Sequence, residues 1–248
     1  MLVAAIAAFV GAALQSSVGF GFALVVGPAL FSFLEPTEAL TTLIILGTAV
    51  NLLMLFGERR PRQVRGDRVA VVLVWSLPGL AAGAMILAAI AKSALQIAVG
   101  VAVIAAVEVQ ARVRTRPHAH PHAREPVWAA PVVGFTTGVL GTTTGTSGPP
   151  VVLWFQRLEF RPAEFRDSLA VAFLALNVFS VLALLVFGDG VASPALGSIL
   201  VLAGATLAGQ LVGRRLFDRL DSDLFRTAGI VLVVCAGIAS VVAGLAAA

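Results

Sequence analysis

The sequence predicts an all-α polytopic membrane protein with an inverted-topology repeat, and three observations support this class. Apolar residues make up 59% of the 248 positions and charged residues only 12%. A soluble domain is roughly half apolar and one-quarter charged. Long apolar stretches follow one another along the chain, and nearly all of the basic residues lie in the connections between them. Such a charge distribution is typical of the topology signals of membrane proteins.

The composition also excludes several other classes. No continuous basic face with interleaved aromatic residues occurs, so nucleic acid is not an expected partner. Cys235 is the single cysteine, which excludes a disulfide within one chain. The sequence contains neither a phosphate-binding Gly-x-x-x-x-Gly-Lys loop nor a serine nucleophile with a base. We therefore expect no enzyme activity, no cofactor and no metal site within the spans.

Eight apolar stretches are long enough to enter a membrane, for which a helix needs roughly 20 residues. Two of them, residues 2–34 and 127–155, are too long for a single crossing. The other six are expected to cross once each, at residues 39–56, 69–91, 94–109, 168–187, 195–212 and 224–247.

Both of the longest stretches contain a run of glycine and hydroxyl residues that interrupts a helix. The runs are QSSVGFG at residues 15–21 and GTTTGTSGPP at residues 141–150. Inside a helix, glycine costs about 1 kcal/mol and proline about 3 kcal/mol relative to alanine. Each stretch is therefore expected to form a hairpin of two short helices that enters and leaves on one side. Two short full crossings are the alternative, and both readings give an even number of crossings.

The arginine distribution favours a hairpin at residues 127–155. With that hairpin, 16 of the 17 basic residues lie on one side of the membrane, and Lys92 alone lies on the other. If every stretch crossed once, the division would be nine to eight. Basic residues collect in cytoplasmic loops. We therefore expect the arginine-rich connections to lie on the cytoplasmic side of the cytoplasmic (inner) membrane and both termini to lie on its outer side.

Internal similarity divides the chain into two repeats, at residues 1–109 and 127–248, with a cytoplasmic linker at residues 110–126. A shift of 129 residues aligns the last helices of the two halves. Each repeat then holds one hairpin and three crossings, and this odd number inverts the second repeat, as in many secondary transporters. The main alignment uses a shift of 126 residues and pairs Phe9 with Phe135, Gly19 with Gly145, Pro36 with Pro162, Glu38 with Glu164, Asn51 with Asn177 and Gly83 with Gly209.

The two breaks form the candidate binding site. Non-helical backbone within a membrane survives only where protein or a water-filled cavity satisfies its polar groups, so the two tips are expected to face each other at the centre. Their free N–H groups and hydroxyls suit a small oxyanion. Asn51 and Asn177 are the strongest side-chain candidates, either as donors to the ligand or as partners of the unwound backbone. Gln15 and Gln210 are weaker candidates, because single amides often bond between helices.

The runs Gly19-Phe20-Gly21-Phe22-Ala23-Leu24 with Gly27-Pro28, and Gly141 to Gly145 with Gly148-Pro149-Pro150, resemble the signature of the sulfite exporter TauE/SafE family. The resemblance covers essentially the whole chain. It implies a transporter that moves sulfite, sulfonates and related small sulfur-containing anions across the lipid bilayer. The family's glycine-rich binding region corresponds here to Ser16, Ser17, Gly19, Gly21, Thr142, Thr143, Thr144, Gly145, Ser147 and Gly148.

Three histidines in the linker keep a second function open. His118, His120 and His122 alternate with alanine and proline, an arrangement that a metal-binding tract can have. The alternative is thus a metal-cation transporter that uses the linker. The oligomeric state is likewise open, with a homodimer as one option.

Overall fold

The computed structural model describes residues 1–57, 61–115, 128–158, 160–217 and positions 238, 242 and 245. Over these residues it is helical, which confirms the predicted all-α class. The crossing expected at residues 224–247 and most of the linker, including the three histidines, lie outside the described residues. The helices are α1 (Leu2–Val18), α2 (Phe22–Phe33), α3 (Pro36–Phe56), α4 (Gly66–Ala89), α5 (Lys92–Thr115), α6 (Ala129–Thr143), α7 (Gly148–Arg157), α8 (Pro162–Phe187) and α9 (Leu196–Phe217).

Both of the longest apolar stretches are broken at their glycine-rich runs. Three glycines at the breaks have left-handed backbone, Gly19 with φ 93°, Gly21 with φ 114° and Gly145 with φ 68°. Side-chain-bearing residues avoid this conformation, because their Cβ approaches the carbonyl oxygen too closely. Glycine therefore permits the short turns that separate α1 from α2 and α6 from α7.

The helix lengths identify a multi-pass membrane protein. Among the described residues, α3, α4, α8 and α9 are long and apolar enough to cross a membrane. The halves of the broken stretches are shorter, since α2 has 12 residues, α6 has 15 and α7 has 10. At about 1.5 Å per residue, these three helices reach only part of the way across the roughly 30 Å hydrocarbon core.

Several helices begin before the apolar stretch that predicted them, because their first turns are polar. Both α3 and α8 start with a proline at their first position, where the missing N–H costs nothing. At the start of α8, the Glu164 carboxylate accepts a hydrogen bond from the backbone N–H of Arg161 at 3.1 Å. This contact stabilises the first turn of α8. Helix α5 runs on to Thr115, into the segment expected to be linker.

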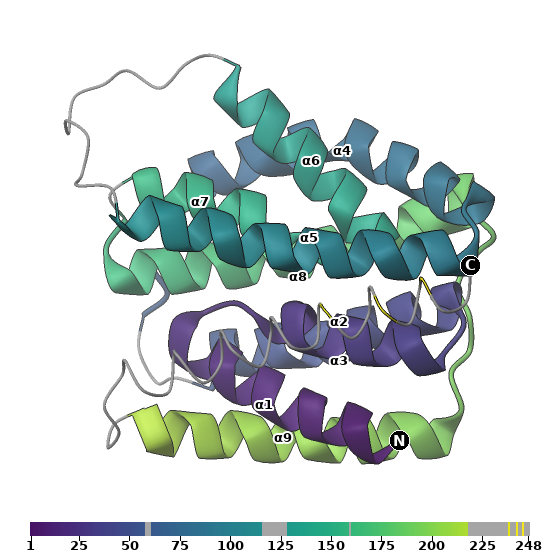
Figure 1. Ribbon diagram of the computed structural model, residues 1–248. Coiled ribbons are helices and arrows are strands. Elements are labelled where there is room, and N and C mark those ends of the chain that lie inside the picture. Colours follow the sequence, from purple (N-terminus) through teal and green to yellow (C-terminus); the bar gives the residue numbers. More distant parts are fainter. Residues whose placement is uncertain are drawn as a thin grey trace.

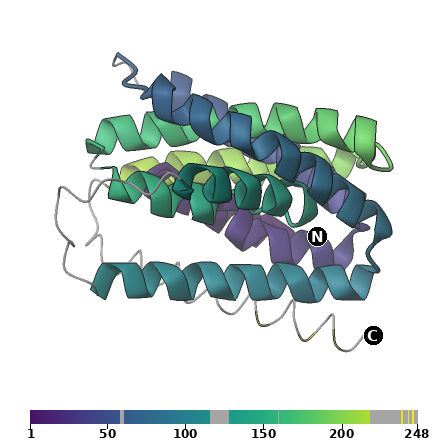
Figure 2. The ribbon, with the colours of Figure 1, turned by 90° about the horizontal axis from the view of Figure 1, so that it is seen from above.

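The helices form two groups, and each group contains one exchanged helix, which belongs to the other half of the chain (Figure 1). Helices α1, α2 and α3 pack with α9, whereas α6, α7 and α8 pack with α4. Each group therefore combines a broken hairpin and the helix after it with a helix from the other half of the chain. The groups meet where α3 contacts α8. Helix α5 packs against α2 and lies along one edge of the molecule (Figure 2).

Glycines allow the exchanged helices to approach closely. Gly209 of α9 lies against the carbonyl oxygen of Phe9, and Gly79 of α4 lies against that of Phe135. A Cβ at either glycine would overlap the carbonyl. One turn later, Gly213 meets Ala13 and Ser16, and Gly83 meets Val139 and Thr142. The sequence alignment paired Gly83 with Gly209, but these contacts pair Gly79 with Gly209, one helical turn away.

Three arginine-rich connections meet at one end of the molecule. The backbone N–H of Gln63 donates to the Asp167 carboxylate at 2.8 Å, and that of Arg65 donates to the Ser168 hydroxyl at 2.9 Å. The Arg214 guanidinium donates to the Gly57 carbonyl at 3.3 Å, at the end of α3. The connections after α3, before α8 and after α9 thus lie on the same side.

Candidate functional site

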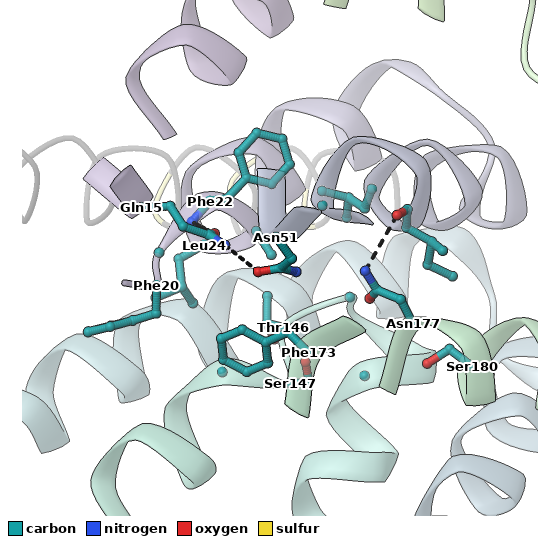
Figure 3. Close-up of a pocket in the computed structure, with 18 residues that line it drawn as sticks. Gln15, Phe20, Phe22, Leu24, Asn51, Thr146, Ser147, Phe173, Asn177 and Ser180 are labelled. Atoms are coloured by element: carbon teal, nitrogen blue, oxygen red, sulfur yellow. Dashed lines mark hydrogen bonds between the residues drawn. The ribbon is translucent and has the colours of Figure 1, made fainter. Parts of the chain in front are cut away.

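A pocket lies where the two helix groups meet, and it encloses about 620 Å³ of empty space including its opening (Figure 3). Both breaks contribute to the wall, together with one face of α3 and one face of α8. The lining residues are Gln15, Phe20, Gly21, Phe22, Ala23, Leu24, Leu43, Ile44, Gly47, Asn51, Gly141, Gly145, Thr146, Ser147, Gly148, Phe173, Asn177 and Ser180.

The first break supplies backbone donors to this pocket. The N–H of Phe22, at the start of α2, donates to the Gln15 side-chain oxygen at 3.2 Å. The next two N–H groups, of Ala23 and Leu24, have no backbone acceptor among the described residues. A helix N-terminus carries a partial positive charge, so these groups favour a negatively charged ligand.

The second break differs at the start of its half-helix, α7. Pro149 and Pro150 occupy the first turn of α7 and have no N–H. The N–H of Thr146 donates to the Leu140 carbonyl at 3.3 Å, within the hairpin. The Ser147 hydroxyl remains, and it makes no hydrogen bond with any residue that the structure describes. Every residue in the first turn of α2 thus has an N–H, whereas two residues in the first turn of α7 have none.

The two asparagines at equivalent sequence positions lie on opposite walls of the pocket (Figure 3). Asn51 of α3 accepts a hydrogen bond from the Gln15 side chain at 2.9 Å. Asn177 of α8 donates to the Thr48 hydroxyl at 3.0 Å and lies 3.5 Å from the Ile44 carbonyl. Asn177 thus ties α8 to α3, whereas Asn51 ties α3 to the first hairpin.

Two deeply buried side chains of the pocket wall have unused donors. Asn51 is 3% exposed, and its side-chain nitrogen makes no hydrogen bond within the described part of the chain. Ser180 is also 3% exposed, and its hydroxyl likewise has no partner there. A ligand or water in the pocket is the natural partner for both.

Among the residues that the structure describes, no charged side chain lines the pocket. The nearest cation to the first break is Arg166 of α8, whose guanidinium donates to the Ser16 carbonyl at 3.1 Å and whose aliphatic part lies against Gly19. At the second break the equivalent position is Leu40, which lies against Gly145. The positive charge of Arg166 therefore lies at the first break, whereas the equivalent position at the second break has an apolar side chain.

Comparison with known proteins supplies the family. The sequence profile of the sulfite exporter TauE/SafE family matches residues 3–240. The chain belongs to this family. Membership makes it a membrane transport protein of the class that moves sulfite and related sulfur anions. No curated protein and no solved structure matches the chain.

The structure brings part of the expected TauE/SafE binding region to the pocket. Six of the residues named from the sequence line it, namely Gly21, Asn51, Gly145, Ser147, Gly148 and Asn177. Five others, Ser16, Gly19, Thr142, Thr143 and Thr144, are not part of its wall. The side chain of Ser17 lies outside the described residues.

The hydroxyl groups outside the pocket wall donate to carbonyls of their own helix. Thr143 donates to Val139 at 2.7 Å, and Ser16 donates to Ala13 at 2.8 Å. The Thr142 hydroxyl also approaches the Leu80 carbonyl of α4, at 3.0 Å. Such local bonds form because α6 continues through Thr143, so that a carbonyl one turn back lies within reach.

Sequence reasoning missed several residues of this TauE/SafE pocket. Phe20 and Phe173 supply apolar wall, and Ser180 supplies a hydroxyl. Ser180 follows Asn177 by three positions, a spacing that places two side chains on one helix face. That spacing was the available signal. For Phe173 the sequence carried no signal, because phenylalanines are frequent throughout the chain.

Proposed function

We propose that this protein is a secondary transporter that exports small sulfur-containing oxyanions, such as sulfite or organosulfonates, through the pocket at the α3–α8 contact. The observation that carries the proposal is the set of donors without partners on a wall that has no charged residue. Asn51, Ser147 and Ser180 supply side-chain donors, and the start of α2 supplies backbone donors.

This donor set favours an anion over a cation. A metal cation would need carboxylate, imidazole or free carbonyl ligands. Within the described part of the chain, the pocket wall contains no carboxylate and no histidine, and the side-chain oxygens of Gln15 and Asn51 already accept hydrogen bonds. An oxyanion with several acceptor atoms would instead pair with the unused donors.

Neutral donors also suit a site that must release the ion it binds. A transported ion must bind well enough to enter the site and weakly enough to leave it. A lysine or arginine within the wall would form a strong charge-assisted bond with an oxyanion. Amides, hydroxyls and a helix N-terminus hold the ion without that full charge.

The arrangement of the helices supports alternating access by an inverted repeat. Each helix group contains one hairpin and one exchanged helix, held together by close glycine contacts. The contact between α3 and α8 carries the pocket, and it is the place where the two groups meet. We infer that the groups rock about this contact and open the pocket alternately to the two sides.

The membrane potential can supply the driving force for export. With the arginine-rich end in the cytoplasm, the potential is negative on the side from which the anion leaves. Each exported negative charge then gains about 2.3 kcal/mol per 100 mV. A coupling ion is not required for this direction.

The test is sulfite flux into or out of proteoliposomes that contain the purified protein. We expect saturable flux, reduced at least tenfold in Gly145→Ala and in Asn177→Ala. At Gly145, a Cβ would come within 2.7 Å of the Leu43 side chain in a backbone conformation that alanine avoids. Wild-type rates in both folded variants would remove the pocket from the transport path. Absence of flux for sulfite and for sulfonates would remove the proposed function itself.

A further inference from the structure

The side chain of Gln15 lies inside the first break. It belongs to α1, four residues before Gly19, and it is 4% exposed. Its side-chain nitrogen donates to Asn51 at 2.9 Å, and its oxygen accepts from the Phe22 N–H at 3.2 Å. Figure 3 shows the two bonds as a continuous bridge from α3 to the start of α2. The amide thus covers the first N–H of the half-helix that faces the pocket.

The bond from Phe22 to Gln15 is the weaker end of this bridge. Its N···O distance of 3.2 Å lies at the long limit of N–H···O hydrogen bonds, whose usual value is about 2.9–3.0 Å. The acceptor is also a neutral amide oxygen at the positive end of a helix, where a negative oxygen binds more strongly. An anion that reaches this N–H therefore offers a better acceptor than Gln15 does.

The second break has no such side chain. A shift of 126 residues places Gly141 at the position equivalent to Gln15. A Cβ at Gly141 would have ordinary contacts, at 3.4 Å from Ser147 and 3.8 Å from the Ser180 hydroxyl. The space that Gln15 fills at one break is thus left to the pocket at the other.

Two side-chain donors without partners in the described residues line the same pocket as Gln15. Asn51, which holds the Gln15 nitrogen, has an unused side-chain nitrogen of its own, and it is nine-tenths buried in the pocket wall. Ser180 adds a buried hydroxyl without a partner in the described residues. These unused donors indicate a ligand independently of the helix N-terminus.

We infer that Gln15 is a displaceable stand-in for the transported anion. In the empty protein its side-chain oxygen occupies the position that an oxygen of the sulfur oxyanion takes at the Phe22 N–H. On binding, the Gln15 amide moves aside, and the anion is held by the start of α2 together with Asn51. The inference rests on the proposed function and names the part of the pocket that recognises the anion.

Gln15→Glu tests this, because it places a carboxylate of the same shape at the same N–H. The probe is methanesulfonate, whose single charge is constant over the pH range used, and binding is measured by isothermal titration. At about pH 8 we expect binding at least tenfold weaker than in the wild type, since like charges at one site cost several kcal/mol. As the pH falls through the pKa of this glutamate, which burial is expected to raise, the side chain takes up a proton and binding should recover.

Gln210→Glu is the matched control. Gln210 is an equally buried amide, 2% exposed, but it lies on α9 and does not line the pocket. Its variant should bind methanesulfonate like the wild type at every pH. Equal affinity and equal pH dependence in the two folded glutamate variants would overturn the inference.

Gln15→Ala decides the question if the glutamate variant does not fold. Without the stand-in, the Phe22 N–H loses its acceptor in the empty protein, so the anion should bind more tightly, roughly fivefold for one net hydrogen bond. Weaker binding in this variant would make Gln15 a ligand and overturn the inference. A wild-type protein that binds neither methanesulfonate nor sulfite would instead refute the proposed function, and this inference with it.

Discussion

Gly209 of α9 lies directly against the carbonyl oxygen of Phe9 of α1, with no room for a side chain between them. The same relationship joins Gly79 of α4 to Phe135 of α6. In each case the first helix of a broken hairpin rests on a helix that belongs to the other half of the chain. The two halves are therefore interlocked, and neither hairpin is supported by its own half alone.

Substitution of Gly209 should disrupt this interlock. Gly209→Leu forces α1 and α9 apart, and such overpacking typically costs about 1–3 kcal/mol or more. We expect a lower unfolding temperature in detergent. Gly204→Ala is the control on the same helix, because a Cβ there meets nothing within 4 Å. It should be neutral or stabilise the helix by about 0.5–1 kcal/mol. An unchanged unfolding temperature in Gly209→Leu would contradict the close packing.

Gly21 should resist substitution for a conformational reason alone. Its φ is 114°, and a Cβ would meet nothing within 4 Å, so alanine would cause strain without a clash. We expect Gly21→Ala to lower the free energy of unfolding by about 1–2 kcal/mol. Gly66→Ala, at the start of α4 with equally open surroundings and no positive φ, should be close to neutral. Equal stability of the two variants would argue against the left-handed turn.

Ser180 should contribute to binding and not to folding. Because its buried hydroxyl has no partner in the described residues, Ser180→Ala should leave the unfolding temperature unchanged or raise it. Sulfite affinity should fall roughly fivefold, the equivalent of one hydrogen bond. Ser76→Ala is the control, since the Ser76 hydroxyl donates to the Leu73 carbonyl outside the pocket. That variant should bind sulfite normally, and a parallel loss in both would refute the assignment.

Arg166 should stabilise the first break through its charge as well as its hydrogen bond. Gln at this position keeps a donor for the Ser16 carbonyl but loses the positive charge. Because hydrogen bonds from charged groups are stronger by about 1 kcal/mol, Arg166→Gln should lower the unfolding temperature measurably. Arg157→Gln, at an exposed position on α7, should stay within about 0.5 kcal/mol of the wild type. No difference between these variants would remove the role given to the charge.

Deletion of residues 118–122 separates the two functions that the sequence left open. Anion transport through the pocket should continue at the wild-type rate, because the wall offers donors and no metal ligands. Within the described residues, no cluster of histidine, cysteine and carboxylate side chains forms a metal site. The measurements are sulfite flux and divalent-cation flux in the same liposomes. A loss of divalent-cation transport on deletion would favour the metal-transport alternative.

Much of the fold followed from local sequence. Composition predicted a helical membrane protein, and the glycine and proline costs predicted the breaks near Gly19 and Gly145. The helix ends were less accurate, because polar first turns such as Pro162 to Glu164 extend a helix beyond its apolar part. Of the candidate site, Asn51 and Asn177 both lie on the pocket wall, and their part in binding stays a prediction.

The sequence by itself determined that the chain lies in a membrane and where its two longest apolar stretches break. These features follow from hydropathy, glycine and proline, which act over a few neighbouring residues. Only the tertiary structure decided the partners across the chain. It directs the Thr143 hydroxyl to the carbonyl of Val139 and exposes the Ser180 hydroxyl to the pocket. It also places Gln15 over the Phe22 N–H. The physical reason is that hydroxyl and amide side chains have several acceptors within reach, and the packing of distant helices selects among them.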